Sequence, residues 1–169
     1  DLTRFLRGQC QRSAQRPDKR ASIRIVAGSF EGDAQGIRRD VMRALRSLRT
    51  DYIDVFLLFW TRSQERLSDE ALTCLRELRA EGKLRAFGLS THHRDLAEQA
   101  VASGSWDVLM IRHSAAHPGA EDRLFPLCAE HGVGVLTFSA LCYGRLLRPV
   151  HTEAAADPNP HAGLMLPAW

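Results

Sequence analysis

The chain has 169 residues, of which 44% are hydrophobic and 25% charged, and its formal net charge at pH 7 is +3. This length suits one domain with a substantial core, and the composition is typical of a soluble globular protein. The absence of any run of about 18 apolar residues excludes a membrane-spanning helix, and the arginines are scattered among acidic residues, which argues against a nucleic-acid-binding surface.

The cysteines point to a protein of a reducing compartment. Cys10, Cys74, Cys128 and Cys142 have neither CxxC spacing nor close histidines in the sequence, which argues against a zinc site, an iron–sulfur cluster and a disulfide scaffold. The N-terminal segment lacks the apolar core and cleavage site of a signal peptide. We therefore expect a cytoplasmic protein without a metal ion. Cys142 has the chemistry of a nucleophile, but no base stands at a spacing that would activate it.

From residue 22 onward, apolar segments alternate with amphipathic ones, which predicts strands and helices in regular succession. Ser68 is a typical helix N-cap, with Asp69 and Glu70 in the first turn, and Gly82 is a typical helix stop. In chain order we expect a strand at 22–28, a helix at 32–48, a strand at 53–60, a helix at 68–82, a strand at 84–90, a helix at 95–102, a strand at 106–112, a helix at 120–131 and a strand at 133–138.

This alternation of five strands with four helices predicts an α/β fold with a parallel sheet and flanking helices. The nearly continuous apolar run at 53–60 is typical of a strand buried on both faces of such a sheet. A further helix is possible at 2–12. We expect one domain over residues 1–148, followed by a Pro-rich extended tail over residues 149–169.

Three segments carry family-like motifs. Asp51–Trp60 reads DYIDVFLLFW, Leu75–Ser90 reads LRELRAEGKLRAFGLS, and His131–Leu141 reads HGVGVLTFSAL. In this order and at this spacing they resemble motifs of the aldo-keto reductases, and the resemblance runs from about Ile23 to Leu147. Proteins of this family fold as an eight-stranded parallel barrel and reduce small-molecule carbonyl substrates with NADPH, so the resemblance implies this fold, cofactor and substrate class.

The resemblance covers strands three to seven of the barrel. It therefore implies a partial (β/α) TIM-barrel-like sheet of about five of the eight units, since a complete barrel takes about 250 residues. An incomplete barrel has two open sheet edges with unpaired backbone groups. Either the chain is part of a longer polypeptide, or its own termini, a second copy or a partner chain covers these edges.

The resemblance also locates the catalytic residues of the family, and none is kept in this chain. The family's Tyr and Asp follow a second strand that has no counterpart here, its Lys matches the stretch Val26–Gly28, and its His matches Phe59. Phe59, followed by Trp60, would give an apolar floor that cannot donate a hydrogen bond to an oxyanion. The alternative is that Phe59 is part of the buried core.

The positions that hold the cofactor in the family are better kept. The resemblance assigns the nicotinamide amide to Ser90 and Thr91, and ring stacking to Phe138. Met110 stands where the family has a Gln. The loop that follows Phe138 would contact the cofactor and its pyrophosphate, through Ser139, Leu141 and Arg145, whose guanidinium suits a phosphate. The alternative is that Ser90 and Phe138 only pack against their neighbours.

Histidines cluster in the loops that follow two strands. His92, His93 and His113 are candidates for a general acid, and with His117 they raise metal binding as an alternative. The stretch from Arg112 to Glu121, with its AAHPGAE sequence, resembles a less-studied branch of the family. We expect an NADPH-dependent oxidoreductase whose chemistry is altered or of which this chain is a fragment. The alternative is a catalytically inactive barrel remnant that serves as a binding or assembly module.

Overall fold

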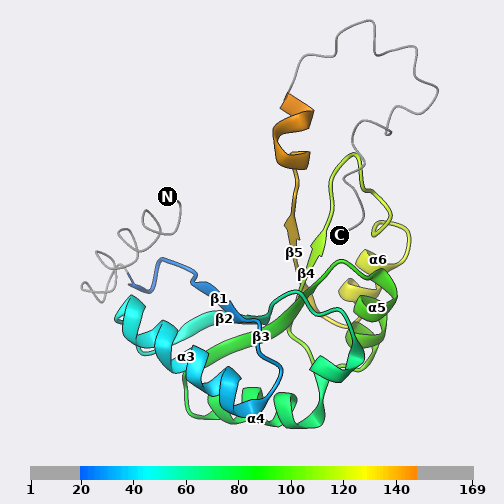
Figure 1. The fold of residues 1–169 in the computed structure, drawn as a ribbon. Coiled ribbons are helices and arrows are strands. Elements are labelled where there is room, and N and C mark those ends of the chain that lie inside the picture. Colours follow the sequence, from blue (N-terminus) through cyan, green and yellow to red (C-terminus); the bar gives the residue numbers. More distant parts are fainter. Residues whose placement is uncertain (1–19, 148–169) are drawn as a thin grey trace, which may run out of the picture.

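The computed structural model describes residues 20–147, so the possible helix at 2–12 and the tail at 149–169 lie outside the described residues (Figure 1). Five parallel strands form one sheet, and their order in the sheet is their order in the chain. They are β1 (Val26–Ser29), β2 (Ile53–Leu58), β3 (Leu84–Thr91), β4 (Val108–Arg112) and β5 (Gly134–Phe138). The predicted α/β fold with a parallel sheet is confirmed, and the sheet is not closed.

Helices connect the strands and cover the outer side of the curved sheet (Figure 1). They are α3 (Ala34–Leu48), α4 (Asp69–Ala80), α5 (Arg94–Ala102) and α6 (Leu124–Glu130), with short 3-10 segments η1 (Gln64–Leu67) and η2 (Cys142–Leu147). Within residues 20–147, no helix combines the length and the apolar character needed to cross a membrane.

Side-chain caps set the starts of the first two helices. Asp33 accepts a hydrogen bond from the amide of Gly36 at 2.8 Å, and Ser68 accepts one from the amide of Ala71 at 3.2 Å. Such caps satisfy amides that have no partner inside the helix, and each is worth about 1 kcal/mol. The apolar faces that follow the caps are buried against the sheet in one continuous core.

Two element starts differ from the predictions by more than two residues. β1 begins at Val26 rather than at residue 22, because the amide of Ile25 donates to the Asp54 carboxylate at 3.0 Å instead of to a strand. α6 begins at Leu124 rather than at residue 120. Pro126 has no amide hydrogen and cannot continue a helix that started earlier, although it is tolerated in a first turn.

The carboxyl end of β2 also differs from the prediction. The strand ends at Leu58, and Phe59 and Trp60 follow it in a turn in which Trp60 has a left-handed φ of 55°. The Phe59 amide still donates to the Ser29 carbonyl at 2.8 Å, so the turn stays attached to β1. This geometry places both aromatic rings above the end of the sheet.

The two outer strands pair on one side only within the described part of the chain. β1 pairs with β2, and β5 pairs with β4. Val26 on β1 is 43% exposed and Val135 on β5 is 37% exposed. The predicted open edges are therefore present in residues 20–147.

Candidate functional site

A pocket of about 550 Å³ opens at the carboxyl ends of the strands, which is the side of parallel barrels where chemistry takes place. Strands β3, β4 and β5 and the loops that follow β1, β2, β3 and β5 contribute to it. We call it the aromatic pocket, and its lining residues are Phe30, Phe59, Trp60, Ser90, His92, Met110, Phe138 and Tyr143. Its walls are mostly apolar, with hydroxyl and imidazole groups at a few points, as in many sites for small molecules.

Phe59 forms one wall of the aromatic pocket and is half-buried. Its ring lies 5.6 Å from that of Phe30, centroid to centroid, at an interplanar angle of 49°. Gly28 stands directly beneath it, since a Cβ atom there would lie 2.7 Å from Cε2 of Phe59. The structure thus places Phe59 at the pocket surface, and no imidazole or ammonium group occupies the Phe59 and Gly28 positions.

His92 lies between the rings of Phe138 and Trp60 in the aromatic pocket. Its ring meets Phe138 edge-on, with centroids 4.8 Å apart, and lies 6.1 Å from the ring of Trp60. Burial lowers the pKa of His92, and the charges of Arg112, His93 and Arg62 lower it further. The imidazole is therefore held toward its neutral form, in which one ring nitrogen donates and the other accepts.

Only some of the residues that the sequence assigns to a cofactor line the aromatic pocket. Ser90 and Phe138 line the aromatic pocket, whereas Thr91 is fully buried and its hydroxyl oxygen accepts a hydrogen bond from the His93 amide at 3.0 Å. Ser139 has a left-handed φ of 59°, and its carbonyl accepts from the Cys142 amide at 2.9 Å. Leu141 is 52% exposed.

Arg145 lies in η2, but its side chain is outside the described part of the chain. Tyr143 of the same segment reaches the aromatic pocket. The sequence alone indicates no role for Tyr143, because a tyrosine shortly after a strand carries no signal by itself. Its left-handed φ of 57°, next to Gly144 at 82°, redirects the chain and brings the phenol ring over the pocket.

The other candidate histidines lie away from the aromatic pocket. His93 is exposed at the N-cap of α5. His113 Nε2 lies 2.8 Å from a carboxylate oxygen of Glu121, and its ring packs edge-on against Phe125. Glu121 is thus a hydrogen-bond partner of His113 and lies before the start of α6 at Leu124. Residues 20–147 contain no group of three or more His, Cys, Asp or Glu side chains that could hold a metal ion.

The expectation that Cys142 has no base near it is wrong. Cys142 Sγ lies 3.8 Å from Nδ1 of His117, and the hydroxyl of Ser114 lies 3.1 Å from each of these atoms. The three residues sit in loops after β4 and β5, neighbouring strands whose carboxyl ends meet. A spacing of 25 residues hides this contact in the sequence, and only the pairing of the two strands reveals it.

Comparison with known proteins agrees with this architecture. The sequence model described as Aldo/keto reductase family matches residues 5–165. The NADH-specific methylglyoxal reductase of Escherichia coli (strain K12) is 31% identical over 114 residues, which cover 66% of this chain and 35% of that protein.

Solved structures show the same fold. The holo form of an aldo-keto reductase from Bacillus halodurans superimposes with a TM-score of 0.73 at 26% identity, over 83% of this chain and 50% of that one. An aldo/keto reductase from Klebsiella pneumoniae in complex with NADP and acetate gives a TM-score of 0.64 at 25% identity, over 83% of this chain and 51% of that one. The chain spans about a third to a half of the length of these relatives. Because the family model covers most of the chain, the protein belongs to the aldo/keto reductase family.

Proposed function

We propose that this chain carries the nicotinamide-facing and substrate-facing part of an NADPH-dependent oxidoreductase that reduces small carbonyl compounds by altered chemistry. The observation that carries the proposal is that Ser90, Phe138 and Phe59, from three separate segments, line one pocket at the carboxyl ends of the strands. A relative named as a methylglyoxal reductase and a structure solved with NADP support the substrate class and the cofactor.

The described residues fit a nicotinamide group. The ring of Phe138 offers an aromatic surface for a planar heterocycle, and the Ser90 hydroxyl can both donate to and accept from a carboxamide. The buried Thr91 would position the loop beside it by holding the His93 amide. Ser139, Leu141 and Arg145 are proposed to contact the rest of the nucleotide. When bound, the nicotinamide supplies the hydride for carbonyl reduction.

Besides the Ser90 hydroxyl and the Trp60 indole, the aromatic pocket contains two further hydrogen-bond donors, His92 and Tyr143. We assign the general-acid role to His92 ahead of His93 and His113, because the last two do not line this pocket. The lowered pKa of His92 makes its neutral form the main one at pH 7, so it would act chiefly as a hydrogen-bond donor to the carbonyl oxygen. The proton that this oxygen takes up would come from the minor imidazolium form of His92 or from the Tyr143 phenol.

The apolar Phe59 would both slow the reduction and change which substrates fit the pocket. A missing oxyanion donor costs about 10²–10³ in rate, so we expect weak reduction of simple aldehydes. The Phe59 ring also favours flat or hydrophobic substrates, because together with Phe30 and Trp60 it gives the pocket an apolar surface.

The test is a fluorescence titration with NADPH and, in parallel, NADH, followed by turnover of methylglyoxal and an aldehyde panel. We expect NADPH to bind, with Phe138→Ala weakening binding at least about tenfold, and Phe125→Ala, which lies against His113 and outside the pocket, as the control. The proposal fails if wild-type protein binds neither nucleotide and turns over no carbonyl compound.

A second candidate is an inactive binding or assembly module. The exposed Val26 and Val135 on the two open edges favour it, because unpaired parallel edges are templates for another strand. It predicts a homo-oligomer or a complex with a partner chain. Sedimentation of the whole chain as a compact monomer, with 1–148 resistant to proteolysis and 149–169 removed, would favour the enzyme reading and the proposed domain boundary.

A further inference from the structure

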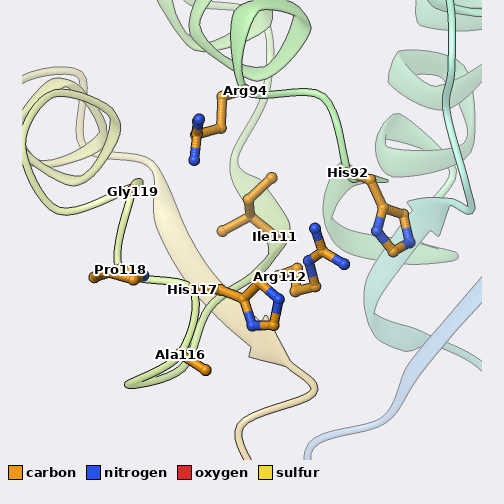
Figure 2. Close-up of a pocket in the computed structure, with 8 residues that line it drawn as sticks. All are labelled: His92, Arg94, Ile111, Arg112, Ala116, His117, Pro118 and Gly119. Atoms are coloured by element: carbon orange, nitrogen blue, oxygen red, sulfur yellow. The ribbon is translucent and has the colours of Figure 1, made fainter. Parts of the chain in front are cut away.

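A second cavity, of about 240 Å³, lies between the start of α5 and the loop that joins β4 to α6 (Figure 2). We call it the cationic cavity. It is smaller than the range of about 300–1,000 Å³ that holds whole small-molecule ligands, so it suits one group of a ligand. Its lining residues are His92, Arg94, Ile111, Arg112, Ala116, His117, Pro118 and Gly119.

The ionisable side chains of this cavity are all basic. They are Arg94, Arg112, His92 and His117, and no carboxylate lines the cavity. Within residues 20–147, neither Arg94 nor Arg112 forms an ion pair or a hydrogen bond through its side chain. Two guanidinium groups without an acidic partner, at one cavity, create a local excess of positive charge.

Two acidic residues of the adjoining elements have other partners, and Asp95, the neighbour of Arg94 in α5, forms no ion pair with either arginine within residues 20–147. On α5, Glu98 pairs with Arg123 at 2.9 Å, and in the β4–α6 loop Glu121 pairs with His113 at 2.8 Å. The positive charge also acts on His92, whose pKa burial lowers first and the charge of Arg112 lowers next. An anion in the cavity would pair with the two arginines and would reduce the electrostatic repulsion between Arg112 and a protonated His92.

The backbone leaves space for the arginine at one side of the cavity. A Cβ atom at Gly119 would collide with Nη1 of Arg94 and lie 2.9 Å from its Cζ atom. With a larger residue at position 119, the flexible Arg94 side chain would have to move away from this position. Arg94 is also the first residue of α5, and the positive end of a helix favours an anion nearby.

We propose that the cationic cavity binds a phosphate group. Arginine guanidinium groups suit the geometry of phosphate oxygens because they donate two parallel hydrogen bonds, and the two histidines supply further nitrogen donors when protonated or in the right tautomer. His92 lines both the cationic cavity and the aromatic pocket. A phosphate held in the cavity is thus adjacent to the pocket in which the proposed carbonyl reduction would occur.

Calorimetric titration of the whole chain with inorganic phosphate tests the site. We expect saturable binding at one site and a loss of at least about tenfold in affinity for Arg112→Gln and for Arg94→Gln, because each removes charge-assisted hydrogen bonds. Gly119→Val should weaken binding as well, by displacing Arg94 without removing a charge. The titration contains no nucleotide and measures no turnover, so its result is independent of the proposed reductase function.

Arg76→Gln is the matched control, since Arg76 is an exposed arginine of α4 whose side chain donates a hydrogen bond to Ser105 at 3.4 Å and lies outside the lining of the cationic cavity. It should bind phosphate as the wild type does. Absence of saturable binding to the wild type would overturn the proposal, and so would an equal loss in Arg76→Gln and Arg112→Gln, which would show a non-specific charge effect. Circular dichroism confirms that each variant is folded.

A second titration identifies the source of the phosphate. If the group belongs to a carbonyl compound that spans His92, glyceraldehyde 3-phosphate binds more tightly than inorganic phosphate, and Phe138→Ala weakens only the former. If free phosphate is the ligand, the two bind equally and Phe138→Ala changes neither. Glyceraldehyde without phosphate should bind more weakly than its phosphate ester, and tighter binding of the unphosphorylated aldehyde would overturn the proposal.

Discussion

The ring of Phe59 lies over Gly28, in the space that a side chain at position 28 would need. A Cβ atom there would collide with the Leu57 carbonyl oxygen and stand 2.7 Å from Cε2 of Phe59. The lysine of the family, which matches the stretch ending at Gly28, therefore cannot be restored at this residue without moving both the backbone and the Phe59 ring. The two departures from the family motif are physically linked.

Gly28→Ala should lower the free energy of unfolding by about 1–3 kcal/mol, as expected for overpacking against rigid neighbours. Urea denaturation measures this change. Gly134→Ala is the control, because a Cβ atom at that strand residue meets nothing nearer than the Asp107 carbonyl oxygen at 3.6 Å. An equal loss of stability in both variants would mean that replacing a strand glycine is itself destabilising, and that the Phe59 contact does not explain the effect at Gly28.

Asp54 should govern part of the acid stability. Burial alone would raise the pKa of this carboxyl, but hydrogen bonds from the Ile25 amide and Arg20, with the charges of Arg20 and Arg85, lower it overall. A carboxyl with a lower pKa in the folded state stabilises the fold above its unfolded pKa, and this contribution is lost as the pH falls through the folded pKa.

We therefore expect stability to decline below about pH 4, and Asp54→Asn to abolish that part of the decline. At neutral pH, Asp54→Asn should cost about 3 kcal/mol, because Arg20 is left buried without its partner. Thermal unfolding across the pH range measures both effects. Asp51→Asn, at an exposed residue, should change stability by less than about 0.5 kcal/mol, and a similar cost in the two variants would argue against the ion-pair account.

Arg112→Gln should raise the pKa of His92 toward its usual value of about 6.5, since it removes a positive charge that disfavours the imidazolium. The shift is partial, because burial of His92 remains. NMR titration of the imidazole protons measures it. Arg76→Gln should leave the His92 titration unchanged, and an unaltered pKa in Arg112→Gln would show that Arg112 does not act on this ring.

Cys142 should react with methyl methanethiosulfonate faster than Cys74 and Cys128. Burial raises the pKa of the latter two thiols, whereas Cys142 has an imidazole nitrogen at 3.8 Å. Mass spectrometry of timed digests gives the three rates. His117→Gln should slow the reaction at Cys142 alone. Equal rates at the three buried cysteines would show that access, and not the histidine, controls the chemistry.

Much of the sheet could be predicted because buried parallel strands are nearly continuous apolar runs, as in Ile53–Leu58. Boundaries were less predictable where a long-range contact competes with the local pattern. Asp54 takes the Ile25 amide from 29 residues away and shortens β1. The start of α6 had a local signal in Pro126, which the prediction of a helix from residue 120 did not use.

The candidate site was predictable where a motif names a residue, as at Ser90 and Phe138, which meet in the aromatic pocket. Tyr143 and the contact between His117 and Cys142 were not, because each depends on how the loops after β4 and β5 fold over the ends of the strands. Left-handed residues set that path, and in non-glycine residues the sequence gives little sign of them.

Because the strands follow the same order in the sheet as in the chain, the described part of the protein can be cut into two contiguous pieces. Every ladder joins consecutive units, so a cut in the turn between α4 and β3 separates β1 and β2 from β3, β4 and β5 without breaking any other ladder. The first piece would keep α3 and α4, and the second would keep α5 and α6. The two pieces would reassociate through the β2–β3 ladder. We expect such split halves, expressed together, to reconstitute the sheet, which would make this architecture a natural scaffold for fragment complementation.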